Sequence, residues 1–287
     1  MGSSWRLGRA FGIDVYVHWS FLLIPALVLY GNLDSGLAVA LAGVGLVLAL
    51  FGCVVLHELG HALMARSFHI GTRDITLYPI GGIARLERMP ERPLAEILIA
   101  IAGPLVNVVI AFGLWLGLAL SGRELSLNLL SHNLVVQLLA ANVGLVVFNM
   151  LPAFPMDGGR VLRAGLSFFM NRVRATEVAV GVSRVLSLGF LILAFTQWGS
   201  LILAFIAVFV FLAGSQELAA VRMREAWRGA GFEPGMAAPR QPYARADGPV
   251  APGWSGFTWD PRTGVWIQWH NGEPIGASSV GGTPNSR

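Results

Sequence analysis

The sequence predicts an α-helical integral membrane protein with about six transmembrane helices and a small membrane-associated β-hairpin between the second and the third. Of its 287 residues, 55% are hydrophobic and only 13% are charged, whereas soluble domains carry about 25% charged residues. Apolar runs recur at lengths near the ~20 residues that a spanning helix needs. The arginines gather in alternate connections between these runs. An ordinary soluble domain is therefore excluded.

Six apolar segments are candidates for the spanning helices. Their approximate limits are 15–30, 36–56, 94–120, 134–151, 179–196 and 201–218. The first segment is short and contains Pro25. The fifth and sixth are separated only by a few residues around Trp198 and Gly199, which favours a tight helical hairpin.

The distribution of arginine predicts the orientation of the spans. All basic residues are arginine, and between spans three and four the only one is Arg123. The other arginines near the spans lie before span one, between spans two and three, between spans four and five or just inside span five, and after span six. They are Arg6, Arg9, Arg66, Arg73, Arg85, Arg88, Arg92, Arg160, Arg163, Arg172, Arg174, Arg184, Arg222, Arg224 and Arg228. By the positive-inside rule both termini are cytoplasmic, in a bacterial or archaeal cell membrane. Since these residues are not gathered on one face, we expect no nucleic-acid partner.

The connection between spans two and three does not resemble a helix. In residues 70–86, Thr, Ile, Leu and Tyr alternate with other residues, and the run is broken by Pro79 and the pair Gly81–Gly82. We predict two short strands around a glycine turn, and the alternative is an irregular loop.

The last part of the chain differs in composition from the rest. We predict a membrane domain over 1–228, a flexible linker rich in Pro, Gly and Ala over 229–253, and a Trp-rich cytoplasmic tail over 254–287. The four tryptophans of the tail flank a turn-like Asp260–Gly264 segment. They predict either a small β-hairpin with a regulatory partner or a segment at the lipid interface.

The sequence His57-Glu58-Leu59-Gly60-His61 carries the clearest chemistry. On a helix, His57 and His61 share one face, so both imidazoles can bind one Zn²⁺. Zinc lowers the pKa of a bound water to about 7, and Glu58 can accept the proton of that water. Three ionisable groups at the end of an apolar span cost about 2.5–3.5 kcal/mol each on insertion scales, which argues against an accidental motif.

A catalytic zinc needs a third protein ligand, and Asp157 is the best candidate. Spans two and four run in the same direction, so His57, His61 and Asp157 all lie near the cytoplasmic ends of their segments. Other carboxylates lie on the opposite side, in the Arg-rich connection, or near helix ends, where a solvated or paired charge explains them.

These motifs resemble the site-2 protease family of intramembrane zinc metalloproteases, peptidase family M50. H-E-L-G-H is followed about a hundred residues later by N-x-x-P-x-x-P-x-D-G-G-R. Further matches are A-G-P-L-V-N at 102–107, the glycine turn at 80–82 and the opening stretch at 12–20. The chain is similar to a short form, with no room for the PDZ or CBS domains of some relatives.

The resemblance implies that His57, His61 and Asp157 bind one zinc ion per chain and that Glu58 is the catalytic base. It also implies an edge strand near residues 76–85 to which an extended substrate pairs. The implied substrate-binding residues are Asn149, Asn107, Gly81 and Gly82.

The predicted function is hydrolysis of peptide bonds in or near transmembrane segments of membrane proteins, with the active site toward the cytoplasmic side of the bilayer. One alternative is a membrane metalloprotease of another class, whose third ligand is a glutamate. The other is a non-catalytic membrane scaffold or transporter with a vestigial metal site.

Overall fold

The structure is a computed structural model that describes residues 4–79, 81–90, 92–121, 133–198, 200–229, 253–260 and 265–279. The chain divides into two compact units, Met1–Gly231 and Phe232–Arg287. Among the described residues, the first unit holds the helices and a four-stranded sheet, and the second holds a three-stranded sheet.

The four-stranded sheet joins two segments that are distant in the sequence. Its order is β1 (Ser4–Ala10), β2 (Ile13–His18), β3 (Thr72–Tyr78) and β4 (Gly81–Leu86). β1 pairs with β2 and β3 with β4 in antiparallel fashion, whereas β2 and β3 are parallel. The parallel pair is possible because a long helical connection lies between these two strands. β4 lies at one edge of the sheet.

The predicted first span starts too early and needs correction. Residues 15–18, predicted as its beginning, belong to β2, in which buried and less buried side chains alternate. Val15 and Val17 are buried, and Val17 packs with Phe51 of the following long helix. Hydropathy alone missed the strand, because valine and tyrosine are apolar in either structure and only the period of two distinguishes them.

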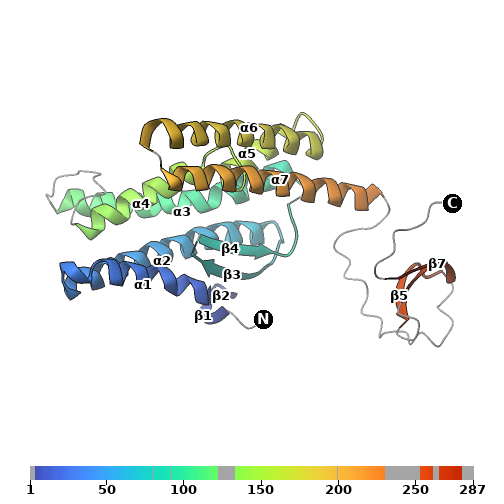
Figure 1. Cartoon of the computed structure of the whole chain (residues 1–287), viewed down its shortest axis with the longest axis horizontal. Helices are drawn as coiled ribbons and strands as arrows, with labels where there is room; N and C mark the ends of the chain where they lie inside the picture. Colours follow the sequence, from blue (N-terminus) through green and yellow to red (C-terminus); the bar gives the residue numbers. More distant parts are fainter. Residues whose placement is uncertain are drawn as a thin grey trace. The chain divides into compact units, whose positions relative to one another are not determined.

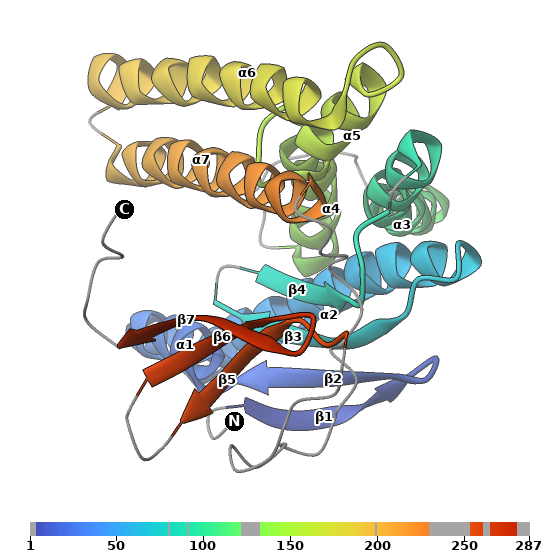
Figure 2. The ribbon, with the colours of Figure 1, turned by 90° about the vertical axis from the view of Figure 1, so that its right-hand side faces the viewer.

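The helices of the first unit are labelled in Figure 1. After η1 (Trp19–Leu22), α1 (Leu23–Gly31) and η2 (Leu33–Ser35) come the long helix α2 (Leu37–Ser67), α3 (Pro93–Leu120) and α4 (Leu134–Asn149). The remaining elements are α5 (Asp157–Leu166), α6 (Arg172–Leu193), η3 (Ala194–Trp198) and α7 (Leu201–Gly229). α6 and α7 form a neighbouring pair (Figure 2).

Within the described residues, four helices are long and apolar enough to cross a membrane. They are Leu37–Ser67, Pro93–Leu120, Arg172–Thr196 and Leu201–Ala226. Trp19–Gly31 and Leu134–Asn149, at the positions of predicted spans one and four, are shorter apolar helices. The 16 residues of α4 extend about 24 Å, less than the ~30 Å hydrocarbon core. The count of six spans remains a prediction.

The short helix α5 is held by a buried network of charges. The Arg163 side chain is 1% exposed, and its Nε donates to Glu96 Oε1 of α3 over 2.8 Å. Arg163 also donates to Glu217 of α7, and Arg172 of α6 donates to Glu96 over 3.1 Å. The Arg163 guanidinium lies 5.1 Å from the centre of the Phe154 ring. Both Glu96 and Glu217 are thus paired, and the network joins α5 to three helices.

The second unit contains a three-stranded antiparallel sheet where the sequence predicts a hairpin. Its strands are β5 (Gly256–Asp260), β6 (Val265–His270) and β7 (Glu273–Ser279). β6 and β7 are joined by Asn271 and Gly272, both with positive φ, as a tight Asn-Gly turn requires. Trp269 Nε1 donates to Thr258 Oγ1 over 2.8 Å. Most of the predicted linker lies outside the described residues.

Candidate metal centre

Helix α2 presents His57 and His61 on one face, one turn apart. Both side chains are buried, with 7% and 8% of their surface exposed. Their Nε2 atoms lie 3.1 Å apart. The helix continues to Ser67, beyond the predicted end of span two, so the H-E-x-x-H motif is helical throughout. The spacing of four residues therefore brings the two imidazoles together.

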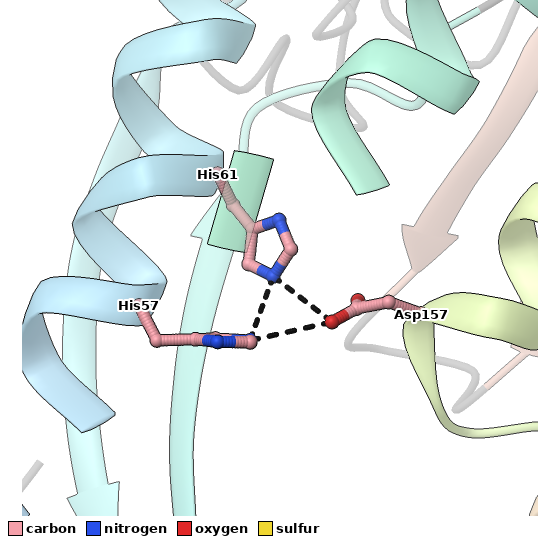
Figure 3. A group of neighbouring side chains, drawn as sticks. All are labelled: His57, His61 and Asp157. Carbon is pink, nitrogen blue, oxygen red and sulfur yellow. Dashed lines mark hydrogen bonds and ion pairs between the residues drawn. The ribbon is translucent and has the colours of Figure 1, made fainter. Parts of the chain in front are cut away.

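Asp157, the first residue of α5, completes a group of three (Figure 3). Its Oδ2 lies 3.3 Å from His57 Nε2 and 3.2 Å from His61 Nε2. The aspartate is buried. Among the described residues, this is the one group of three His, Cys, Asp or Glu side chains whose ligand atoms could hold a metal ion together.

Hydrogen bonds behind the histidines fix the orientation of both rings. His61 Nδ1 donates to the Ile99 carbonyl of α3 over 2.7 Å. His57 Nδ1 lies 2.5 Å from Asn107 Oδ1. Because Nδ1 of each ring is engaged on the far side, Nε2 of each ring faces the group of three. Outer contacts of this kind orient metal-binding histidines and raise their basicity as ligands.

Glu58 lies beside the metal group and against strand β4. Its Oε2 accepts a hydrogen bond from the Ala84 backbone N–H over 3.2 Å. Gly82 makes this approach possible, because a Cβ there would lie 2.7 Å from Glu58 Cγ. Gly81 adopts a φ of +134°, which side chains other than glycine rarely tolerate. The glycine pair thus allows an edge strand to approach the carboxylate.

A pocket of about 310 Å³ opens on this group. Its lining includes His57, Glu58, His61 and Asp157, together with Gly81, Gly82, Ile83 and Ala84 of β4. Asn149 at the end of α4 and Arg160 of α5 also line it. The pocket therefore connects the metal group with the edge of the sheet.

Comparisons with known proteins agree on one family. The family model for peptidase family M50 matches residues 45–132. The solved structure of a site-2 protease from Methanocaldococcus jannaschii resembles this chain with a TM-score of 0.55 and 32% identity, covering 75% of this chain and 95% of that one. This chain belongs to the site-2 protease family.

The curated relatives that this chain matches are similar in sequence but longer. A zinc metalloprotease of Methanocaldococcus jannaschii is 33% identical over 217 residues, which is 76% of this chain and 61% of the relative. Stage IV sporulation protein FB of Bacillus subtilis is 30% identical over 153 residues, which is 52% of this chain and 46% of that protein. The chain thus spans less than two thirds of the length of these relatives.

The residues present fit the zinc ion of the site-2 protease family. Tetrahedral zinc with bonds of about 2.0–2.1 Å holds its ligand atoms roughly 3.3–3.4 Å apart. The three separations here are 3.1, 3.2 and 3.3 Å. Two imidazole nitrogens and one carboxylate oxygen are ligands that zinc prefers, and three protein ligands leave a position for water or substrate.

The structure places the predicted substrate-binding residues in two different environments. Asn149, Gly81 and Gly82 line the pocket. Asn107 is fully buried behind His57, a position that favours orienting the ring over touching a substrate.

Two further residues of the site escaped the sequence reasoning. A Cβ at Gly103 of α3 would lie 2.3 Å from His61 Nε2 and 2.7 Å from His57 Nε2. Asn142 of α4 is fully buried and accepts from Asn107 Nδ2 over 2.8 Å. The A-G-P-L-V-N match contained a signal for Gly103, but no motif pointed to Asn142.

Proposed function

We propose that this chain is an intramembrane zinc metalloprotease that hydrolyses peptide bonds in or near transmembrane segments of membrane proteins. The observation that carries the proposal is the group of His57, His61 and Asp157 with Glu58 beside it, in a pocket bounded by the sheet edge. His57, His61 and Asp157 are proposed as the zinc ligands, one ion per chain, and Glu58 as the catalytic base.

Zinc, Glu58 and Asn149 have different proposed roles in the hydrolysis of the peptide bond. When bound, zinc lowers the pKa of a water toward about 7 and polarises the substrate carbonyl. Glu58 accepts a proton from the attacking water as the water oxygen bonds to the carbonyl carbon. Glu58 then returns this proton to the nitrogen of the leaving amine as the C–N bond breaks. Asn149, which lines the pocket, donates its amide N–H to the substrate carbonyl or to the developing oxyanion.

The edge strand β4 is the proposed binding surface for the substrate backbone. Gly82 and Ala84 line the pocket, and within the part of the chain that the structure describes no strand pairs with the outer side of β4. A peptide bond within a helix is hydrogen-bonded and shielded, so the substrate must unwind before it is cleaved. An extended segment can then pair with β4 beside Glu58. This pairing is a proposed use of the predicted membrane-associated hairpin.

The proposed topology has six spans, both termini in the cytoplasm and the metal group near the cytoplasmic surface. Its support is the alternation of arginine-rich and arginine-poor connections. In this arrangement water enters from the cytoplasm, and Arg160 lines that route. The three-stranded tail is proposed to bind a regulatory partner, and the segment 229–253 to link it to the membrane domain.

The deciding experiment compares the wild-type chain with Glu58→Gln in reconstituted vesicles. It measures zinc content and cleavage of a transmembrane reporter. We expect the variant to hold about one zinc and to cleave nothing, because the amide cannot accept the proton. Glu177→Gln, which removes a surface carboxylate of α6, is the matched control and retains cleavage. A wild-type chain without zinc refutes the proposal, and zinc-bound chain inactive toward every reporter favours the scaffold alternative.

A further inference from the structure

A chain of buried amides leads away from the metal group and is not used by the proposed mechanism. Asn107 of α3 and Asn142 of α4 are both 0% exposed. His57 Nδ1 lies 2.5 Å from Asn107 Oδ1, and Asn107 Nδ2 donates to Asn142 Oδ1 over 2.8 Å. Asn142 Nδ2 donates to the Leu138 carbonyl over 2.8 Å. The chain therefore connects His57 of α2 with the backbone of α4, through three helices.

The far end of this chain fixes the direction of every hydrogen bond in it. The Leu138 carbonyl can only accept, so Asn142 must turn its Nδ2 toward it. The second hydrogen of Nδ2 faces Cys53 Sγ at 3.5 Å. Asn142 Oδ1 then faces Asn107 and can only accept, so Asn107 must donate to it from Nδ2. This leaves Asn107 Oδ1 as an acceptor toward His57.

The direction of these bonds selects one tautomer of His57. An amide oxygen facing Nδ1 requires the ring to carry its proton on Nδ1. The lone pair is then on Nε2, the atom that lies 3.3 Å from Asp157 Oδ2. The opposite amide orientation would favour the tautomer with a proton on Nε2, which points at the position of the metal and blocks the ligand atom.

We propose that Asn142 is a positioning residue that fixes the metal-binding tautomer of His57 through Asn107. This role rests on the proposed zinc site but concerns a helix that supplies no ligand. Buried amides are costly within apolar spans unless both donor and acceptor are satisfied. Here the hydrogen bonds of each amide fit only one orientation. The Leu138 carbonyl therefore determines, through both amides, which nitrogen of the His57 ring carries the proton.

The first test needs neither zinc nor activity. In metal-free wild-type chain labelled with ¹⁵N-histidine, solid-state NMR reports the protonated nitrogen of each neutral ring, and a His57→Gln sample assigns the His57 signal. We expect His57 to carry its proton on Nδ1. A His57 Nδ1 that carries no proton in the wild type overturns the proposal, whatever the variants do. This result is independent of proteolysis, whose failure would count against the proposed function alone.

The second test is a double-mutant cycle on zinc affinity, measured by competition with a chelator. Asn142→Leu removes the acceptor for Asn107, and Asn107→Leu removes the contact to His57. We expect each variant to lose about 10–100-fold in zinc affinity, the range for outer-shell partners of metal ligands. The double variant is expected to lose no more than Asn107→Leu alone, because Asn142 acts only through Asn107.

The control is Ser187→Ala, which removes another buried hydrogen bond between helices, from Ser187 Oγ to the Ala207 carbonyl over 2.7 Å. It is expected to keep wild-type zinc affinity. If the losses of Asn142→Leu and Asn107→Leu add, or if Asn142→Leu binds zinc as the wild type does, Asn142 does not act through the ring and the proposal is wrong.

Discussion

Gly103 and Gly82 are the positions where a single added methyl group would meet functional side chains. Gly103 faces the Nε2 atoms of both histidines, and Gly82 faces Glu58 Cγ. Neither glycine has a positive φ, so glycine is required at these positions by the available space and not by the backbone conformation. A substitution at Gly103 therefore tests the metal group, and a substitution at Gly82 tests the position of the proposed base.

Gly103→Ala is expected to prevent zinc binding. The new Cβ would lie 2.3 Å from His61 Nε2, and both rings would have to leave the positions in which they face Asp157. Zinc content after purification measures this loss. Gly113→Ala on the same helix is the matched control, because nothing lies within 4 Å of its Cβ. Equal zinc content in the two variants would contradict the close approach of α3 to the histidines.

Gly82→Ala is expected to retain zinc and to lose most cleavage. A Cβ 2.7 Å from Glu58 Cγ displaces the carboxylate or β4, and the three atoms nearest to this Cβ belong to Glu58 and Val54 rather than to the histidines. The measurement is kcat for a transmembrane reporter together with zinc content. Gly8→Ala in β1, where the added Cβ meets nothing, provides the control and keeps full activity. Loss of zinc in Gly82→Ala would show that β4 supports the metal group itself.

Among the elements, α5 must be positioned most accurately, because its first residue, Asp157, is the third member of the metal group. The helix is only ten residues long and cannot be stable by itself. Its anchor is Arg163, paired with Glu96 of α3 and Glu217 of α7. The charge network thus sets the distance between Asp157 and the histidines of α2.

Arg163→Met is expected to destabilise the chain by about 3–5 kcal/mol, the range for removing one member of a buried ion pair. Two carboxylates, Glu96 and Glu217, would lose their shared cation. Thermal unfolding in detergent compares this variant with Arg222→Met, which breaks the exposed Arg222–Glu177 pair. The exposed pair contributes about 0–1 kcal/mol, so similar Tm values for the two variants would refute the anchoring role.

For the molecule as a whole, the remaining question is how many helices cross the bilayer. Four helices in the described residues are long enough, whereas Trp19–Gly31 and α4 are shorter. An even number of spans puts both termini on one side, and four or six spans both satisfy this. The side of the membrane on which residues 122–132 lie distinguishes four spans from six. If α4 crosses the membrane, this segment and Asp157 lie on opposite sides, and if α4 does not cross, they lie on the same side.

Labelling with a membrane-impermeant maleimide is expected to follow the six-span arrangement. Ser4→Cys and Ser255→Cys should react only when the cytoplasmic face is accessible, and Ser131→Cys only from the opposite face. The native Cys53 is buried, so the parent chain provides the unlabelled control. Reaction of Ser131→Cys from the cytoplasmic face would mean that α3 and α4 do not both cross the membrane.

The sequence by itself determined the local features of this site-2 protease. A spacing of four residues places His57 and His61 on one helical face, and the arginine pattern relates the ends of segments 36–56 and 134–151, which led to Asp157 as third ligand. The long apolar runs predicted α2, α3, α4, α6 and α7, and α1 in part. The helical placement of these residues follows from the sequence because helix period and hydropathy depend on neighbouring residues along the chain, whereas the role of Asp157 as a zinc ligand and the orientation of the spans stay predictions.

Only the tertiary structure decided how distant segments meet. It placed residues 15–18 in a sheet with β3, joined Arg163 to Glu96 and Glu217, brought Gly103 against the histidines and connected His57 to Asn142 through Asn107. The partners are separated by 35 to 67 residues in the hydrogen-bonded pairs that involve Asn107 and Arg163. No local period encodes such contacts, because they depend on which faces of the packed helices finally oppose one another.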